Sequence, residues 1–320
     1  MDAVTDSPAS RAPSAPSTRP APPAAPSASR GSAASGGTPP RLIATDLDGT
    51  LLHDDKSVSD RTVAALAAAE VAGIDVFFVT GRPARWMGVV SDHVHGHGLA
   101  ICANGAAVVD LHRGRQVVRV RPLAREDALT VVSALRAAAP GVTFAVERSG
   151  GIHYEPGYPP LHLDPVAVVA PAEKLLAPGF GGGEVAEGTA VAEGAEQPVL
   201  KLLAFHRELE PDAFLALARE AAGGHAEFTR SSRSALLEIS GSGVSKASTL
   251  ERCCTERGIG PEEVVAFGDM PNDLEMLSWA GTSYAMANAH PDVLAATTHR
   301  TAANEDDGVA AVIEELLRGR

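Results

Sequence analysis

From Arg41 onward, short apolar segments alternate with helical segments, and this alternation constrains the fold more than any other feature of the sequence. The first segments are the apolar LIATD, the helical SDRTVAALAAAEVAG, the apolar IDVFFVTG, a helix expected from Pro83, and the apolar LAICANG. Continuous apolar runs of this length are typical of strands buried on both faces, and strand–helix–strand repeats produce parallel sheets. The order of segments therefore predicts an α/β fold with a Rossmann-like, doubly wound parallel sheet as its core.

The same alternation returns near the C-terminus, in the helical VSKASTLERCCTERG followed by EVVAFGD, NDLEMLSWAG and TSYAMAN. Between the two α/β parts, the strand-like VVRVR, VTFAVE, PVAVVA and VLKLLAFH mix with the helical REDALTVVSALRAAA and PDAFLALAREAA. This mixture predicts an inserted α+β cap domain with its own hydrophobic core. We expect a tail over 1–40, the core domain over 41–115 and 236–320, and the cap over 116–235.

Composition limits the classes of partner and compartment. Residues 1–40 are rich in Pro, Ala and Ser and have too few apolar side chains to fold, which predicts a disordered tail. A net charge of -13 argues against nucleic-acid binding, and no apolar run reaches the length of a membrane span. Three cysteines cannot form a disulfide framework, which fits a reducing compartment. We therefore expect a cytoplasmic protein that binds a small molecule.

Two carboxylates, Asp46 and Asp48, follow the first predicted strand in LIATDLDGTLL. A carboxylate at the end of a central strand is costly to bury unless it pairs with a cation or takes part in a reaction. An ordinary turn explains the pair as well, because Asp48-Gly49 suits a chain reversal that Asp46 caps. Taken alone, the two residues leave both explanations open.

Three further polar clusters favour a reaction site. VTGRP ends the next strand at Thr80, SGVSKAS places Lys246 at a helix start, and AFGDMPND ends another strand at Asp269. Loops at the carboxyl ends of parallel strands converge on one crevice, which brings carboxylates, a hydroxyl, an ammonium group and backbone amides together. That set is what phosphoryl transfer requires. Each cluster has an ordinary explanation by itself, such as a solvated lysine or a turn, but their joint order favours the chemistry.

Magnesium is the predicted cofactor. The acidic protein repels a phosphate ester, so a cation has to neutralise the charge of the transferred group. Magnesium takes oxygen ligands, and Asp46 and Asp269 supply them without histidine or cysteine. A second cluster, HVHGH over His93–His97, alternates with glycine in a polar connector, which favours a solvated loop over a zinc site.

The motifs DLDGT, VTGR, VSK and GDMPND, in this order, resemble the four motifs of haloacid dehalogenase-type phosphatases, and most of all the Cof-type subgroup. The resemblance covers 41–320 and includes a long cap between the second and third motifs. It implies magnesium-dependent hydrolysis of a phosphate monoester through an aspartyl-phosphate. One position departs from the pattern, since Ala247 stands where the family often has glycine, and both residues are small.

The resemblance implies a role for each matched position. Asp46 would be the nucleophile, and Asp48 the general acid and base. Thr80 would hydrogen-bond the transferring phosphoryl group, and Lys246 would pair with its charge and with the nucleophile. The implied metal-binding residues are Asp46, Asp48 (through its backbone carbonyl), Asp269 and Asp273. The implied substrate- and phosphate-binding residues are Gly81, Arg82, Asn104, Gly105 and Asn272, with Asn272 contacting the phosphate or Lys246.

The main hypothesis is a phosphatase of small phosphorylated metabolites, such as sugar phosphates or nucleotide-derived phosphates, whose cap selects the substrate. GIHYEPGYPPLH, with Tyr154 and Tyr158, is a candidate for leaving-group contacts, although a packed loop explains it too. Lys201 in VLKLLAFH is interpreted as a cap strand residue, not as the catalytic lysine. Alternatives are a phosphomutase or phosphotransferase of the same fold, or a non-catalytic module that binds a phosphometabolite.

Overall fold

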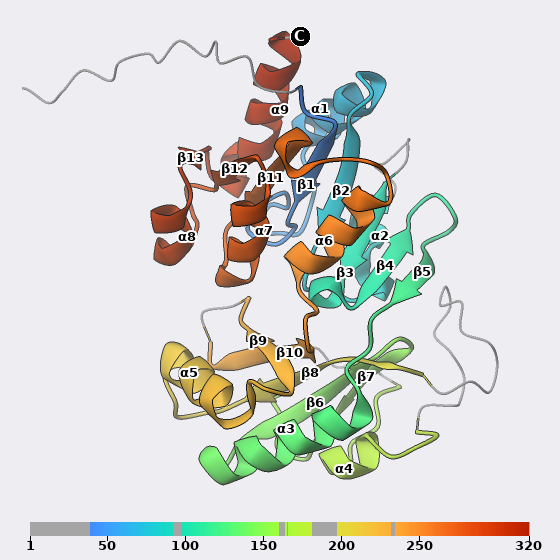
Figure 1. Ribbon diagram of the computed structural model, residues 1–320, viewed down its shortest axis with the longest axis vertical. Coiled ribbons are helices and arrows are strands. Elements are labelled where there is room, and N and C mark those ends of the chain that lie inside the picture. The colour runs from blue at the N-terminus through green and yellow to red at the C-terminus, as the bar shows by residue number, and fades with distance from the viewer. Residues whose placement is uncertain are drawn as a thin grey trace, which may run out of the picture. The chain divides into compact units, whose positions relative to one another are not determined.

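The computed structural model describes residues 39–91, 98–159, 164, 166–180, 197–231 and 234–319. Nearly all of the predicted tail, the His93–His97 run and the Gly-rich segment 181–196 lie outside the described residues. The described chain forms one eight-stranded and one five-stranded sheet (Figure 1). We call the first sheet with its helices the core, and the second with its helices the cap.

The core sheet has the strand order β13-β12-β11-β1-β2-β3-β4-β5. All neighbours from β13 to β3 are parallel, whereas β4 and β5 add an antiparallel edge. Its strands are β1 (Leu42–Thr45), β2 (Asp75–Val79), β3 (Leu99–Cys102), β4 (Ala107–Asp110), β5 (Gln116–Val120), β11 (Val264–Gly268), β12 (Thr282–Ala285) and β13 (His299–Arg300). The predicted doubly wound parallel sheet is therefore confirmed.

Helices cover both sides of the core sheet, which is why its central strands are apolar throughout. The α-helices are α1 (Asp60–Val71), α2 (Gly88–Ser91), α6 (Lys246–Thr255), α7 (Leu274–Trp279), α8 (Pro291–Ala296) and α9 (Gly308–Arg318). Short 3₁₀ turns cover Ala84–Trp86, Ala103–Gly105, Pro261–Glu263, Pro271–Asp273 and Asn304–Asp306. Helix α1 packs against α9, and α6 packs against α7 (Figure 1).

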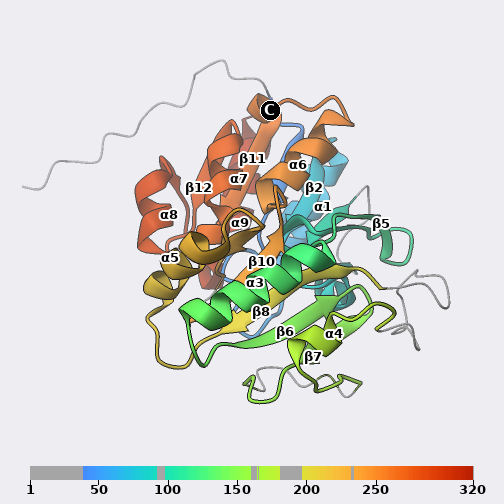
Figure 2. The same cartoon turned by 60° about the horizontal axis from the view of Figure 1, so that its bottom comes forward.

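The cap sheet is antiparallel, in the order β7-β6-β8-β10-β9. Its elements are α3 (Arg125–Ala138), β6 (Thr143–Arg148), β7 (Gly151–Tyr154), α4 (Ala172–Leu175), β8 (Val199–Phe205), α5 (Pro211–Ala222), β9 (Ala226–Thr229) and β10 (Leu236–Gly241). Figure 2 shows α3 and α5 side by side over one face of this sheet. In α3 the buried Ala128, Val131, Val132 and Leu135 recur at helical spacing and face a cap core of their own.

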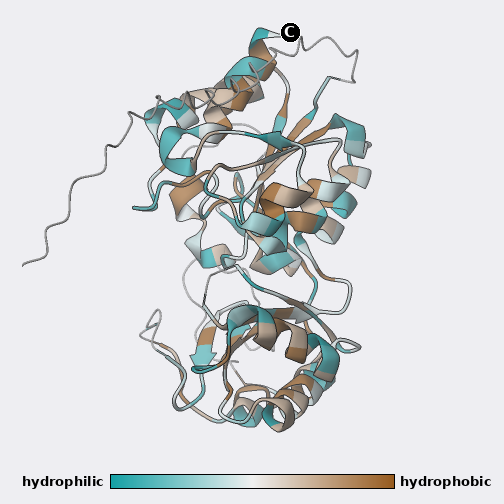
Figure 3. Ribbon diagram, turned by 90° about the vertical axis from the view of Figure 1, so that its left-hand side faces the viewer, coloured by the Kyte–Doolittle hydropathy of each residue, from teal (hydrophilic) through white to brown (hydrophobic). Residues whose placement is uncertain are grey.

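Hydrophobic and hydrophilic residues alternate in bands along the helices (Figure 3), as expected for helices that each cover one face of a sheet. None of the described helices is long and apolar enough to cross a membrane. Cys102, Cys253 and Cys254 are buried free thiols, so these three residues form no disulfide framework.

The sheets do not follow the expected domain limits. β5 belongs to the core sheet, where it pairs with β4, and β10 belongs to the cap sheet, where it pairs with β8 and β9. The VVRVR pattern fits an exposed edge strand of either sheet, so sequence alone did not assign it. The chain enters and leaves the cap at one place, because a Cβ on Gly241 would lie 2.8 Å from the Pro122 carbonyl oxygen.

Two predicted elements are shorter than expected. The helix expected from Pro83 consists only of a 3₁₀ turn and the four-residue α2. In PVAVVA the described residues form a single bridge, between Val169 and Tyr154, and no named strand. Val166 and Val169 are exposed by 72% and 62%, so the apolar run does not gain the burial that sustains a strand.

Candidate active site

Two adjacent central strands deliver carboxylates to the same edge of the core sheet. β1 and β11 are parallel neighbours, and the Asp46 N–H donates to the Phe267 carbonyl oxygen at 3.1 Å, just beyond the last residue of β1. Asp269 directly follows β11. Asp46 and Asp269 are only 5% and 6% exposed. The predicted convergence of these two strand ends is therefore present in the fold.

A third carboxylate and one lysine complete this cluster. Oxygen atoms of Asp46, Asp269 and Asp273 all lie within 4.8 Å of one another, and all three residues are buried. The Nζ of Lys246 donates to Asp46 Oδ1 and to Asp273 Oδ1, each at 2.7 Å. Lys246 is the first residue of α6, whose start is fixed by a capping box in which the Ser245 side chain accepts from the Ser248 N–H. We call these four residues the carboxylate cluster.

The carboxylate cluster has too little positive charge for its buried anions. Burial raises the pKa of Asp46 well above its usual value; Lys246 opposes this shift, and Asp273 and Asp269 add to it. Burial and the neighbouring Asp273 raise the pKa of Asp269 to about 7. Burial also works against the charge of Lys246, but Asp273 and Asp46 outweigh it and raise the lysine pKa. Three carboxylates thus share a single ammonium group.

This donor set fits a divalent cation that prefers oxygen ligands. Asp273 is the most heavily engaged member, because its Oδ1 binds Lys246 and its Oδ2 accepts from the backbone N–H groups of Asp269 and Met270 at 3.1 and 3.0 Å. Asp46 and Asp269 are therefore the better placed to hold an ion, with Asp273 orienting the lysine and the loop.

The turn after β1 requires a glycine at Gly49, the fourth residue of the DLDGT motif. Gly49 has φ = 78°, and a Cβ added to it would lie 2.4 Å from Asp269 Oδ2. Any other residue would be strained and would displace that carboxylate. Two residues that the sequence analysis did not single out support the same contact: Thr50 Oγ1 donates to Asp269 Oδ1 at 3.1 Å, and Asn288 donates to the Gly49 carbonyl at 2.8 Å.

Asp48 lies in a different electrostatic environment. Arg82 holds its carboxylate with two hydrogen bonds of 2.5 and 2.7 Å, and Lys56 Nζ lies 3.0 Å away. Burial favours the proton, but Arg82 and Lys56 outweigh it and lower the Asp48 pKa. Its carboxylate is not among the clustered oxygens, so its predicted metal contact is left to the backbone carbonyl. Thr80 is buried beside this pair, and its Oγ1 accepts from the Arg82 N–H at 3.1 Å.

The ANG turn after β3 connects the core to the cap. Ala103, Asn104 and Gly105 have φ values of 50°, 54° and 102°, a run of left-handed residues that is uncommon outside functional sites. The Asn104 side chain donates to Glu238 of β10 at 2.8 Å and accepts from Asn272 at 3.2 Å. In the structure Asn272 donates to Asn104, whereas the sequence analysis offered the phosphate or Lys246 as its partner.

Gly105 has a packing role in this geometry. A Cβ at this position would lie 2.3 Å from the Ser245 carbonyl oxygen. The glycine therefore lets the turn approach the N-terminus of α6, whose first residue is Lys246.

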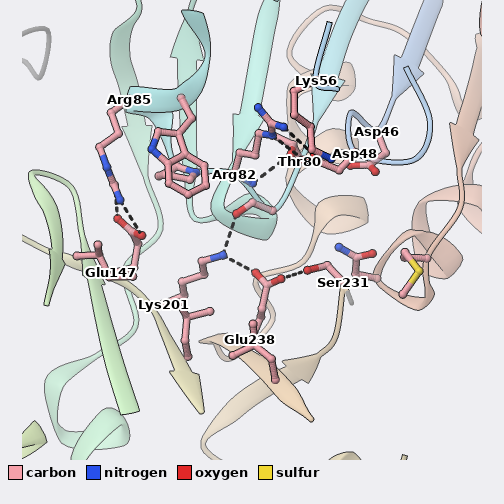
Figure 4. Close-up of a pocket in the computed structure, with 18 of the residues that line it drawn as sticks. Asp46, Asp48, Lys56, Thr80, Arg82, Arg85, Glu147, Lys201, Ser231 and Glu238 are labelled. Atoms are coloured by element: carbon pink, nitrogen blue, oxygen red, sulfur yellow. Dashed lines mark hydrogen bonds and ion pairs between the residues drawn. The ribbon is translucent and has the colours of Figure 1, made fainter. Parts of the chain in front are cut away.

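A cavity of about 630 Å³ extends from these residues to the cap (Figure 4). Its core wall includes Asp46, Asp48, Thr80, Gly81, Arg82 and Trp86. Its cap wall includes Glu147, Tyr154, Tyr158, Lys201, Leu203 and Glu238. The volume is sufficient for a phosphorylated small molecule.

Five charged residues of this cavity received no site role in the sequence analysis: it did not name Lys56, Arg85, Glu147 or Glu238, and it named Lys201 only as a cap strand residue. Arg85 in the 3₁₀ turn after β2 pairs with Glu147 of β6, and Lys201 of β8 pairs with Glu238 of β10. Lys201 also donates to the Gly81 carbonyl oxygen at 2.8 Å, so it links the cap to the TGR motif. A signal was available, since Lys201 and Glu238 each stand inside an otherwise apolar run.

Sequence comparison gives the family. The model of the haloacid dehalogenase-like hydrolases matches residues 43–313. The chain belongs to this family. A 5-amino-6-(5-phospho-D-ribitylamino)uracil phosphatase of Bacillus subtilis is 31% identical over 288 residues, covering 88% of this chain and 98% of the relative. A pyridoxal phosphate phosphatase of Escherichia coli is 30% identical over 285 residues, covering 87% and 98%.

Solved structures agree on the fold of this haloacid dehalogenase-like hydrolase. A phosphatase of the same superfamily from Bacteroides thetaiotaomicron has a TM-score of 0.70 at 23% identity, covering 90% of this chain and 99% of that chain. A protein from Streptococcus mutans has a TM-score of 0.69 at 22% identity, covering 87% and 99%. The family and its named relatives make the chain a phosphoric monoester hydrolase, as the resemblance predicted.

Proposed function

We propose that the protein hydrolyses phosphate esters of small metabolites in two steps, with Asp46 as nucleophile and magnesium as cofactor. The observation that carries this proposal is the carboxylate cluster: three buried carboxylates that share one lysine at the carboxyl edge of the core sheet. Such an excess of buried negative charge is costly unless a cation binds or the groups take part in a reaction. The relatives that act on phosphorylated small molecules support the choice of substrate class.

In the first step, an Asp46 oxygen attacks phosphorus and the bond from phosphorus to the leaving oxygen breaks. Asp48 gives its proton to that oxygen, so an alcohol leaves in place of an alkoxide. In the second step, water attacks phosphorus of the aspartyl-phosphate while Asp48 takes a proton from the water. The bond between phosphorus and Asp46 breaks, which releases inorganic phosphate and restores the carboxylate.

Asp46 and Asp269 would hold the magnesium ion, which would neutralise charge on the transferred phosphoryl group. Lys246 lies 2.7 Å from Asp46, where it neutralises the nucleophile and the phosphoryl oxygens that approach it. The hydrogen bond from the Arg82 N–H holds the Thr80 hydroxyl in place, and this hydroxyl would donate a hydrogen bond to the same phosphoryl group.

Arg82 and Lys56 have a second role in this proposal. They lower the pKa of Asp48 in the free protein, whereas an acid has to carry a proton. A phosphate ester entering the cavity offers both cations a more highly charged anion than the single carboxylate. Movement of the Arg82 and Lys56 side chains from Asp48 toward the ester would raise the Asp48 pKa, and the carboxylate could then take up a proton. Substrate binding would in this way prepare Asp48 to act as the acid.

Phosphate release from a panel of small phosphate esters, with and without magnesium, tests the proposal. Asp46→Asn keeps the side-chain shape and removes the nucleophile, and we expect its turnover to fall by about 10⁴-fold or more. Asp60→Asn is the matched control, because Asp60 is exposed at the start of α1. Mass spectrometry of rapidly quenched wild type should detect phosphorylated Asp46. Full turnover by Asp46→Asn would overturn the assignment of the nucleophile.

A further inference from the structure

The cap sheet turns a charged row and an apolar row toward the core. Glu147 of β6 stands opposite Lys201 of β8, and Glu238 of β10 stands opposite Leu203 of β8, two residues farther along the same face. These three charged residues form the charged row. Every member of it bonds to a core group: Glu147 to Arg85, Lys201 to the Gly81 carbonyl, and Glu238 to Asn104.

The apolar row lies beside the charged row. Ala145 pairs with Leu203 across β6 and β8, and Leu236 pairs with Phe205 across β10 and β8. Together with Tyr154 and Tyr158 they form a small hydrophobic cluster that is separate from the cap core under α3 and α5. Tyr154, Tyr158, Leu203 and Leu236 line the cavity, as do Lys201 and Glu238. A ligand in the cavity therefore meets one polar and one apolar strip of the same sheet.

Most of the hydrogen-bonding positions of Lys201 and Glu238 are occupied by neighbouring groups. An ammonium group donates three hydrogen bonds, and Lys201 makes two, to Gly81 and Glu238. A carboxylate accepts about four, and Glu238 accepts from Lys201, Asn104 and Ser231. Within the described residues, about one donor and one acceptor position thus remain. Both residues line the cavity and point into it in Figure 4.

We propose that Lys201 and Glu238 select phosphate esters whose leaving group carries hydroxyl groups. A hydroxyl group both accepts and donates a hydrogen bond. One hydroxyl can therefore accept from the remaining donor position of Lys201 and donate to the remaining acceptor position of Glu238. A second anion on the leaving group would leave Glu238 facing a like charge, and an alkyl chain would leave the remaining positions unused. This inference rests on the proposed function, because it names the leaving group of that same reaction.

A pair of esters with the same carbon chain tests the inference. Ribitol 5-phosphate and pentyl phosphate share five carbons and the phosphate, and only the first has hydroxyls on the chain. For wild type we expect kcat/KM to be about tenfold or more higher for ribitol 5-phosphate. In Glu238→Gln, which replaces one acceptor oxygen by a donor, the ratio of the two values should fall to within about threefold of one.

Controls separate recognition from loss of structure. A purely structural defect lowers kcat/KM for both esters and leaves their ratio unchanged, which would overturn the inference. Glu256→Gln, at a surface pair with Arg119, should keep the wild-type ratio. If Glu238→Gln does not fold, the double variant Lys201→Met with Glu238→Leu replaces the buried pair by apolar side chains of similar size, and it should lose the preference too.

The same assay distinguishes failure of this inference from failure of the proposed function. Equal kcat/KM for the two esters in wild type, or turnover of p-nitrophenyl phosphate alone, would overturn the role of Lys201 and Glu238 and leave the phosphatase reaction standing. No phosphate release from any of the three esters with magnesium present would overturn the proposed function, and the inference with it.

Discussion

Two groups of buried charges, one at the carboxyl edge of the core sheet and one on the cap sheet, are balanced in opposite ways. In the carboxylate cluster, three carboxylates share Lys246, and burial raises the pKa values of Asp46 and Asp269. In the cap, Glu238 is just as deeply buried, but Lys201, with Ser231 and Asn104, outweighs the burial and lowers its pKa. The contrast fits the proposed function, in which a locally paired charge positions other groups and an unpaired excess of charge marks the site of chemistry and cation binding.

Removal of the shared Lys246 should have the largest effect on stability and turnover. Lys246→Met leaves the buried Asp46 and Asp273 without their cation, and we expect metal-free stability to fall by about 3–5 kcal/mol. Turnover should fall by about 10²–10³-fold or more, because the lysine charge acts directly on the transferred group. Urea unfolding with and without magnesium measures the first effect. Lys174→Met, at an exposed position of α4 away from the cavity, is the control, and equal loss in both variants would contradict the assignment.

The balanced pair in the cap should respond differently to single and double substitution. Lys201→Met alone leaves Glu238 buried and unpaired, which should cost about 3 kcal/mol of unfolding free energy. Adding Glu238→Leu should recover most of that loss, since an apolar pair of similar volume replaces the ion pair. Urea unfolding of the four proteins of this double-mutant cycle measures the coupling. Additive losses would show that the two residues do not act as a pair.

Substitution of two glycines that have the same φ angle can distinguish the effect of backbone strain from the effect of displacing Asp269. Gly49 and Gly73 both have φ = 78°, but a Cβ on Gly49 would lie 2.4 Å from Asp269 Oδ2, whereas one on Gly73 would have no atom within 4 Å. Gly73→Ala should lower stability by about 1 kcal/mol and leave turnover unchanged. Gly49→Ala should in addition reduce kcat by about 10²-fold, because it moves a carboxylate of the site. Equal kcat in the two variants would contradict this explanation.

The last prediction is a pH dependence of stability. Asp269 has a pKa of about 7 in the folded protein against 3.8 in the unfolded chain, so the folded state binds more protons between these values. The contribution of this group to stability is therefore full at low pH and is lost as the pH rises through that window. Between about pH 4 and pH 7, the stability of metal-free wild type relative to Asp269→Asn should decrease. Magnesium should reverse the trend, because it binds the ionised carboxylate. A stability difference between wild type and Asp269→Asn that does not change with pH would contradict the raised pKa of Asp269.

The core site was predictable because topology and chemistry agree there. Asp46, Thr80 and Asp269 follow parallel strands, and the rule that such strand ends meet needs only the order of the segments. The position of Lys246 followed from its place at a helix start. The resemblance also implied the pair of Lys246 with Asp46, which the structure contains. It did not imply the partners of Asp48, which pairs with Arg82 and Lys56, away from the clustered oxygens.

The cap wall was harder to predict, because antiparallel register decides which residues meet. Lys201 lies opposite Glu147 and near Glu238, although these residues are far apart in the sequence. No motif encodes that pairing. The limits of the cap were also misplaced, since an edge strand such as β5 has nearly the same pattern in either sheet. Single charged residues inside apolar runs were the available clue.

The shared entry and exit of the cap, where Gly241 meets Pro122, has a consequence for how such a protein diversifies. Because both connections pass one point, a cap can lengthen, shrink or be exchanged while the parallel strands keep their register. Recombination at this point would combine an old reaction with a new preference for leaving groups. The tight contact at Gly241 is then the constraint that every exchanged cap would have to respect.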